Sequence, residues 1–272
     1  MKKKIGIAFL CAGALLAQDG PEKATVPLSD PSRPAHIHAH LIAGGITVRG
    51  ANTKDVIVEA RSRSGGQSHE WHSGRADGMK RLELPGNSGL DVVEDNNLVN
   101  IKTASWNRPV DLVITVPRRS SLQLKCLNDG DIYVEQVEGE IDADDLNGKI
   151  TLKNVSGSVI AHSLNGAVLA TLDQIDPSKP MSFSTLNGDI DVTLPDNLKA
   201  NVRMKTDNGD IYSDFDVKLD SGSRIVSNES GRRQDGTYHL HFDRALHGTI
   251  NGGGPEFQFT SFNGQIYLRK KK

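Results

Sequence analysis

The sequence predicts an all-β protein whose 272 residues form one elongated β-solenoid, with about two short strands in each coil. The first observation is a glycine that recurs every nine residues between Gly130 and Gly166. The second is the alternation of apolar and polar residues after each glycine, which is typical of a half-buried strand. The third is that no stretch after the amino-terminal leader has the periodicity of an amphipathic helix. Self-similarity at a short fixed period indicates stacked repeats.

The overall composition excludes one class of partner. Hydrophobic residues make up 36% of the chain and charged residues 24%, which is ordinary for a globular protein. The 32 basic and 34 acidic residues give a formal net charge of −2. Binding to a phosphate backbone requires an excess of positive charge, so we expect no nucleic-acid partner. A chain of this length buries a full core without a metal or disulfides, and we expect no cofactor.

The amino-terminal segment predicts export. Lys2, Lys3 and Lys4 precede an apolar run from Ile5 to Leu16 that ends among small residues. This pattern is typical of a signal peptide, which we assign to residues 1–17. The run is shorter than the roughly 20 residues that span a bilayer, so we expect no transmembrane segment once the signal is removed. The protein is then expected in the periplasm, at the cell surface or outside the cell.

The rest of the chain divides into three expected segments. Residues 18–34 form a disordered amino-terminal segment, residues 35–268 form the β-solenoid domain, and residues 269–272 form a basic tail. Within the domain, strands are expected in residues 35–62 and 90–116, separated by a polar, glycine-rich loop. No linker requires a boundary inside the domain, so a single domain is expected.

The repeat unit reads apolar, any, glycine, any, isoleucine or valine, any, apolar. Alternation places Ile132 and Val134 on one face of a strand and polar residues on the other. We expect a glycine with positive φ at each corner of the coil. The corner glycines predicted by the repeat are Gly130, Gly139, Gly148, Gly157, Gly166, Gly188, Gly209 and Gly264.

The residue before the glycine indicates the length of a coil. Asn147 and Asn165 precede glycines that are two units apart, whereas Glu138 and Ser156 precede the glycines of the alternate units. This alternation predicts an 18-residue coil of two strands, with asparagine side chains that hydrogen-bond along the stack. The alternative is an antiparallel meander, because Asn-Gly is also a strong hairpin signal. A meander does not require the alternation, so we favour the solenoid.

The order of these segments resembles a known family. The residues that carry the resemblance are DLVITVP at 111–117, the glycine repeats, LNGDIDVTLP at 186–195 and FNGQIYLRK at 262–270. They are similar to the bacterial putative-adhesin family of exported β-solenoid proteins, a domain of unknown function, and the similarity spans residues 35–270. The resemblance implies a right-handed solenoid. It implies no reaction and supplies no catalytic residues.

Three histidines near the start of the domain suggest a metal-binding envelope module as one hypothesis. His36, His38 and His40 alternate, so on a strand their imidazoles project from one face about 7 Å apart. That spacing is wide for three ligands of one ion, whose bonds are about 2 Å long. We therefore favour exposed histidines and assign no metal site.

Acidic residues in the repeats suggest a second hypothesis, a polysaccharide lyase or hydrolase. Such carbohydrate-active enzymes use carboxylates, and some are built on β-helical scaffolds. Asp131, Glu140 and Asp142 are examples from the repeats. Acidic residues are also the expected solvated choice at turns, and no Gly-x-Ser-x-Gly motif is present. We expect no enzyme and assign no catalytic residue.

Three tyrosines are the candidate surface-binding residues. Tyr133, Tyr212 and Tyr267 each stand three residues after a repeat glycine, on the outward side of a strand. Tyrosines on a flat face can stack on sugars or contact a protein. The sequence therefore predicts a structural or interaction protein that presents an extended surface to an envelope protein or glycan.

Overall fold

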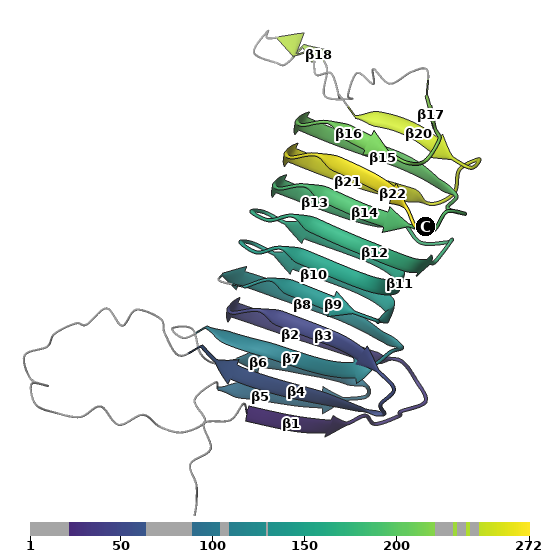
Figure 1. The fold of residues 1–272 in the computed structure, drawn as a ribbon. Helices are drawn as coiled ribbons and strands as arrows, with labels where there is room; N and C mark the ends of the chain where they lie inside the picture. The colour runs from purple at the N-terminus through teal and green to yellow at the C-terminus, as the bar shows by residue number, and fades with distance from the viewer. Residues whose placement is uncertain are drawn as a thin grey trace, which may run out of the picture.

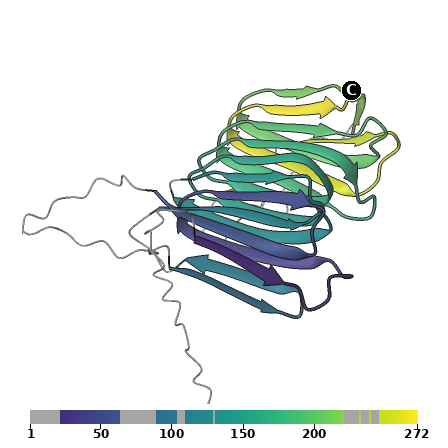
Figure 2. The ribbon, with the colours of Figure 1, turned by 60° about the horizontal axis from the view of Figure 1, so that its bottom comes forward.

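The computed structural model describes residues 22–63, 89–103, 109–128, 130–220, 231–232, 238–239 and 245–272. All regular structure in these residues is β-strand, in a single domain whose main sheet folds into two facing layers (Figures 1 and 2). The predicted signal peptide and the loop between the early strands lie outside the described residues. No helix in the described ranges is long and apolar enough to cross a membrane.

The first layer carries the strands that lead into the Asn-Gly corners. In spatial order it contains β5 (Leu90–Asp95), β6 (Leu98–Thr103), β2 (Ala35–Ala43), β8 (Ser120–Asn128), β10 (Glu138–Asp145), the second half of β11 (Ile150–Ser163), β13 (Met181–Asn187), β21 (Glu256–Asn263), β15 (Ala200–Asn208), β20 (Leu246–Ile250) and β17 (Val217–Leu219).

The second layer carries the strands that leave those corners. It contains, in spatial order, β1 (Glu22–Pro27), β4 (Asp55–Ser62), β7 (Val110–Pro117), β3 (Ile46–Ala51), β9 (Ile132–Glu135), the first half of β11, β12 (Val168–Ile175), β14 (Ile190–Leu194), β22 (Ile266–Lys270) and β16 (Ile211–Ser213). A separate short pair consists of β18 (Gly231–Arg232) and β19 (Tyr238–His239).

Neighbouring coils pair in parallel, as the stacked-coil prediction requires and a meander does not. Ile150 lies beside Ile132 on one side and beside Val168 on the other. Antiparallel pairs are confined to the two ends of the stack, where β5, β1 and β4 lie at one end and β20 and β17 at the other. These antiparallel strands cap the parallel coils.

The order of the coils in space differs from their order in the sequence. The coil of β2 and β3 lies between β6–β7 and β8–β9. The carboxy-terminal coil of β21 and β22 lies between β13–β14 and β15–β16, as the yellow strands within the green part of Figure 1 show. Both terminal regions of the chain are therefore inserted into the stack.

Two predicted segment assignments were wrong. Residues 22–27, expected to be disordered, form β1, which pairs with β4 because Val26 packs against the core. The expected basic tail begins inside β22, and its Lys271 Nζ lies 2.7 Å from Asp173 Oδ1. The ordered stack therefore extends past residues 35–268 at both ends.

The core is the space between the two layers. Inward side chains such as Ile132, Ile150 and Ile190 are fully buried, and equivalent positions repeat from coil to coil. Phe183 and Phe259 stack with ring centroids 5.3 Å apart. Burial of these apolar columns against each other is the main force that holds the layers together.

A ladder of asparagines runs along the Asn-Gly edge and confirms the prediction from the repeats. Each Nδ2 donates to the Oδ1 of the neighbouring asparagine at 2.7 to 3.0 Å. The ladder runs through Asn128, Asn147, Asn165, Asn187, Asn263 and Asn208.

The corner glycines are required for a reason other than the predicted one. Of the glycines assigned to corners, only Gly157 has a positive φ, of 115°. A Cβ added at Gly148 would lie 2.0 Å from the carbonyl oxygen of Gly130, and one at Gly166 would lie 2.1 Å from that of Gly148. Close approach of backbone to backbone, and not left-handed geometry, excludes side chains there. Gly139 and Gly157 lie at the opposite edge, within β10 and β11.

A column of small donors lies just inside the asparagine ladder. In five coils the last inward side chain before the corner donates to a glycine carbonyl of the adjacent coil. These bonds run from Cys126 to Gly44, Ser163 to Gly148, Thr185 to Gly166, Ser261 to Gly188 and Thr206 to Gly264, at 2.8 to 3.1 Å. The Cys126 thiol is buried, and burial raises its pKa to about 12.

Asp145 occupies the same column but offers no donor when it is ionised. Its Oδ1 accepts hydrogen bonds from the backbone N–H groups of Asn147 and Gly148, whereas its buried Oδ2 has no partner. Burial raises the pKa of Asp145 to about 6, and the carboxylates of Asp131 and Asp144 add to the increase. Only the protonated carboxyl could donate as the other members of the column do.

We predict that Asp145→Asn stabilises the protein near neutral pH. The amide keeps the Oδ1 acceptor and places a donor where the unpaired oxygen lies, so the free energy of unfolding should rise by about 1–2 kcal/mol at about pH 7.5. The folded-state pKa exceeds the unfolded value, so protonation stabilises the wild type as the pH falls through about 6.

Urea unfolding at about pH 7.5 and about pH 4.5 checks this prediction. The difference in the free energy of unfolding between the variant and the wild type should shrink at the lower pH. Asp142→Asn, on the outer face of the same strand, is the control for the loss of one negative charge. An advantage that is absent, or equal at both pH values, would contradict the assignment.

Candidate functional site

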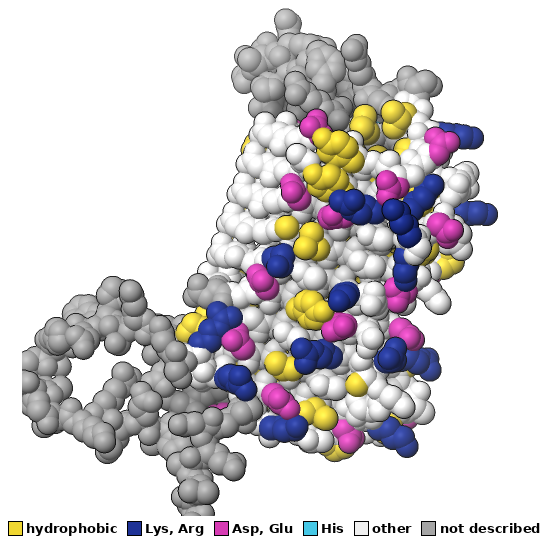
Figure 3. All heavy atoms as spheres, viewed as in Figure 1, with side chains coloured by type: hydrophobic (Ala, Val, Ile, Leu, Met, Phe, Trp, Pro, Cys, Tyr) yellow, Lys and Arg dark blue, Asp and Glu magenta, His cyan; other side chains and the backbone are white. Residues whose placement is uncertain are grey.

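The outer face of the second layer holds all three predicted tyrosines. Tyr267 on β22 lies directly beside Tyr212 on β16, whereas Tyr133 on β9 is several coils away. Thr151, Leu169 and Asp191 occupy the same row between Tyr133 and Tyr267. Figure 3 shows one broad face of the stack, where basic and acidic side chains are scattered from end to end and hydrophobic side chains gather in the upper part. The structure thus brings two tyrosines together and separates the third.

The tyrosine pair forms a stacked column with a guanidinium group. The rings of Tyr212 and Tyr267 are 5.2 Å apart at an angle of 11°, and Arg269 Cζ lies 5.1 Å from the Tyr267 centroid. Arg269 Nε donates to Asp191 Oδ1 at 2.7 Å, a bond that also raises the pKa of Arg269. Cation–π contact and ring stacking fix all three side chains on adjacent strands.

The hydroxyl ends of the pair face polar neighbours. The Tyr212 hydroxyl donates to Asp210 Oδ2 at 3.4 Å, and the negative charge of Asp210 raises the pKa of Tyr212. The Tyr267 hydroxyl donates to Gln265 Oε1. About half of the Tyr212 side chain is exposed. The column therefore offers an aromatic surface with a fixed cation and hydrogen-bonding groups at its rim, which is the chemistry that recognises a sugar ring or a polar peptide.

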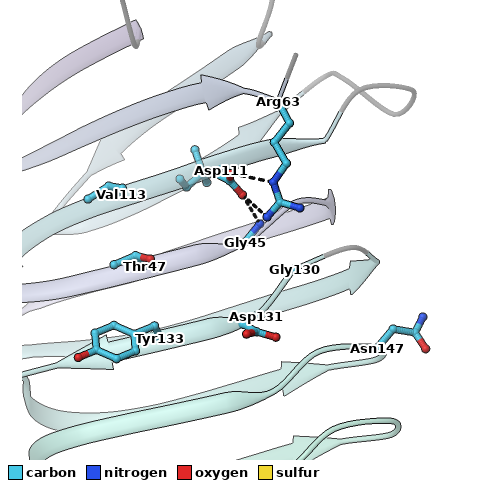
Figure 4. Close-up of a pocket in the computed structure, with 10 residues that line it drawn as sticks. Gly45, Thr47, Arg63, Asp111, Val113, Gly130, Asp131, Tyr133 and Asn147 are labelled. Carbon is cyan, nitrogen blue, oxygen red and sulfur yellow. Dashed lines mark hydrogen bonds and ion pairs between the residues drawn. The ribbon is translucent and has the colours of Figure 1, made fainter. Parts of the chain in front are cut away.

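Tyr133 lies in a separate hollow of the same layer (Figure 4). Gly45, Arg63, Asp111 and Asp131 also line it. Arg63 forms a fork on Asp111, with Nη2 to Oδ1 at 2.6 Å and Nε to Oδ2 at 2.8 Å. The Gly45 N–H donates to the same Oδ1 at 2.9 Å. Burial alone would raise the pKa of Asp111, but the bonds from Arg63 and Gly45 hold it below its usual range.

The three histidines lie in one exposed row on the outer face of β2. His38 lies between Asn100 on β6 and Gln123 on β8, and His40 lies between Lys102 and Lys125. The three imidazoles do not form a metal-binding group. In the described ranges no group of three His, Cys, Asp or Glu side chains is placed to hold a metal ion.

A shallow groove on the first layer brings part of this row near two acidic residues. His36, His38, Glu140, Asp142 and Lys179 line it. Lys179 Nζ forms an ion pair with Glu140, and this hydrogen bond raises the pKa of the lysine. In this groove two acidic residues of the repeats lie near two of the three histidines.

Sequence reasoning missed several partners of the predicted residues. Arg269 was assigned to the tail and Asp191 was given no role, yet they support the tyrosine pair. The Arg63–Asp111 fork joins residues that no motif connects. The spacing of Tyr267 and Arg269, two residues apart on one strand, was the available signal for the first of these.

Comparisons with known proteins give one family and two solved structures. The family described as Toastrack DUF4097 matches residues 111–251. A putative cell adhesion protein from Clostridium sporogenes ATCC 15579 is 11% identical, with 92% of this chain and 100% of that chain covered and a TM-score of 0.43. A putative adhesin from Bacteroides fragilis NCTC 9343 is 12% identical, with coverage of 94% and 99% and a TM-score of 0.39. No curated protein matches the sequence.

We predict that Asp111→Asn destabilises the protein, because it removes the charged fork in the hollow around Tyr133. Loss of the charged fork should lower the free energy of unfolding by about 1 kcal/mol at neutral pH. The folded-state pKa of Asp111 is lowered, so this stabilisation is present above the unfolded pKa of about 4 and is lost as the pH falls below it.

Thermal or urea unfolding should therefore show a deficit for Asp111→Asn at about pH 7 that closes at about pH 3. Asp142→Asn, on the outer face of the first layer, controls for the loss of one negative charge. A deficit of the same size at both pH values would mean that the charge of Asp111 contributes nothing.

Proposed function

This chain belongs to the Toastrack DUF4097 family, and we propose from that premise that it is an exported, non-enzymatic interaction protein. It presents a rigid, extended surface to an envelope protein or glycan, as an adhesin-like module does. The site of contact is the column formed by Arg269, Tyr267 and Tyr212.

One observation supports this site above the others, namely the stacking of two tyrosines and an arginine on adjacent strands. Tyrosine and arginine are enriched where proteins bind partners. Side chains that are already fixed lose little conformational entropy on binding, so a preorganised column binds more tightly than the same residues on a loop. The ordered strands of the stack supply that rigidity.

The location and winding of the stack are part of the proposal. The leader of residues 1–17 directs the chain out of the cytoplasm, and the mature protein acts in the periplasm or at the cell surface. We also propose that the coils wind as a right-handed solenoid, which is the hand that L-residues favour for parallel strands joined by crossovers.

A second candidate function is cleavage of a polysaccharide. The groove that contains Glu140, Asp142 and His38 favours it, because such enzymes act through carboxylates within reach of a sugar chain. The ion pair of Glu140 with Lys179 leaves that carboxylate less available as an acid or base, so binding remains the preferred function.

We predict saturable binding of residues 18–272 to one class of envelope glycan or protein, measured on a glycan array and by pull-down from envelope fractions. Tyr212→Ala should lower the affinity at least about tenfold, as expected for an aromatic anchor. Tyr133→Ala is the matched control, because it removes the same side chain from the same face far from the pair.

The possible results distinguish between the two candidate binding sites and the candidate enzyme function. Binding that Tyr133→Ala abolishes and Tyr212→Ala leaves intact would move the site to the hollow. Shortened glycan products that disappear with Glu140→Gln would favour the enzyme. Absence of saturable binding to every glycan and envelope fraction would overturn the proposed function.

A further inference from the structure

An apolar column runs beside the asparagine ladder. In six coils the residue just before the corner asparagine, or its equivalent, is large and hydrophobic. Backbone pairing places these residues in one line, since Leu146 N–H donates to Cys126 and Leu164 N–H donates to Asp145, each at 3.0 Å. The apolar column consists, in spatial order, of Ile42, Leu127, Leu146, Leu164, Leu186 and Phe262.

This column holds more than half of the exposed large hydrophobic side chains in the described residues. Nine large hydrophobic side chains are exposed in that part of the chain, and five of them, all but Leu164 of this column, lie here with 37–46% of their surface accessible. Strands in a sheet are about 4.8 Å apart, so the column is about 24 Å long. A continuous apolar stripe of this kind indicates a contact surface.

A partner that covers the apolar column also covers the asparagine ladder beside it. Burial of the ladder adds little to the free-energy cost of binding. The ladder amides already bond to one another along the stack. Their side chains are neutral, so a partner that covers this edge does not have to desolvate charge at its centre. The centre of the edge is thus suited to close contact.

Charged residues flank the edge in a complementary pattern. Lys125, Asp144 and Lys205 lie before the corner on the first layer. Asp131, Lys149 and Asp210 lie after the corner in the same three coils. Each of these three coils therefore carries opposite charges on its two flanks.

Within one molecule the ion pairs among these charges are long, although Asp131 Oδ1 also accepts the Lys149 backbone N–H at 2.9 Å and Asp210 Oδ2 accepts the Tyr212 hydroxyl at 3.4 Å. Lys125 Nζ is 3.9 Å from Asp144 Oδ2, and Lys149 Nζ is 3.9 Å from Asp131 Oδ2. About half of each of the four side chains is exposed. Exposed pairs of this length contribute little to stability, so the charges remain available to a partner.

We propose that this edge binds a second copy of the chain, side by side, about a two-fold axis parallel to the stack. Such an axis sets each coil beside the same coil of the other copy and exchanges the two flanks. Lys125 then faces Asp131 of the second copy, Asp144 faces Lys149, and Lys205 faces Asp210. All three pairs attract, and the apolar columns of the two copies meet between them.

An antiparallel arrangement that aligns the two apolar columns over their full length does not produce this match. It sets each flank against the same flank of the second copy, with the coils in reverse order. The charge pattern therefore selects the parallel dimer over the antiparallel one. The contact shares one residue with the surroundings of the tyrosine column, because Asp210 also accepts the Tyr212 hydroxyl. Its other residues lie outside that column, so the dimer neither requires nor excludes the proposed binding function.

Charge-reversal variants test whether the partner is a second copy of the chain. Sedimentation velocity of residues 18–272 should show a dimer as the concentration rises. Asp144→Lys and Lys149→Asp each set like charges against each other and should each shift the wild-type dimer toward monomer. The side chains of these two residues hold no backbone group in the structure, so both variants should keep the wild-type melting temperature.

An equimolar mixture of the two variants restores opposite charges and should form a heterodimer. The double variant should again form a homodimer for the same reason. A wild-type protein that stays monomeric up to millimolar concentration would overturn the proposal, as would a dimer that neither single variant weakens.

Cysteine cross-linking tests the orientation. Ile42 and Phe262 lie at opposite ends of the apolar column, and the native Cys126 thiol is buried. In the parallel dimer, Ile42→Cys and Phe262→Cys should each form a disulfide dimer alone under mild oxidation. Cross-links that arise only when the two variants are mixed would show the antiparallel dimer and overturn the proposed axis.

Ile160→Cys is the matched control for cross-linking. Ile160 is 53% exposed but lies on the outer face of the first layer, away from the edge. It should give no disulfide dimer. Cross-linking of this control at the rate of Ile42→Cys would show that contact at the edge is not specific and would also overturn the proposal.

Discussion

The stack depends on how closely successive corners approach one another. At Gly264 an added Cβ would lie 1.9 Å from the carbonyl oxygen of Gly188, well inside the range that atoms tolerate. Without side chains at the corners, the coils can maintain the spacing of hydrogen-bonded strands across the whole turn. The asparagine ladder and the column of hydroxyl donors both form only at that spacing. One steric constraint thus determines the ladders, the core columns and the line of outward side chains on each face.

Periodicity was sufficient to predict the local part of this arrangement. The 18-residue offset of Asn147 and Asn165 predicted which strands pair, because identical inward patterns stack only in that register. The spatial order of the coils was not predictable in the same way. The units around Ile46 and Ile266 have the same inward pattern as their neighbours, so pattern alone allows any coil to lie beside any other.

The candidate site shows the same limit. The repeat placed Tyr133, Tyr212 and Tyr267 in one row, but insertion of the last coil determines which two are adjacent. Arg269 joins the pair because β22 continues into what the sequence presents as a basic tail. The leucine before Asn147, Asn165 and Asn187 was visible in the sequence as well. Its exposure was not, because a corner residue can turn either inward or outward.

Insertion of the terminal coils also affects how the chain reaches its final form. Residues 256–270 follow β16 in the sequence, yet they separate β14 from β16 and β13 from β15. The stack therefore cannot be completed coil by coil as the chain emerges, and closing this gap requires contacts between distant residues, which slow folding. Once closed, the last coil is held on both sides by its neighbours. Strands at the edge of an array are the usual starting point for fraying, whereas β21 and β22 lie in its interior.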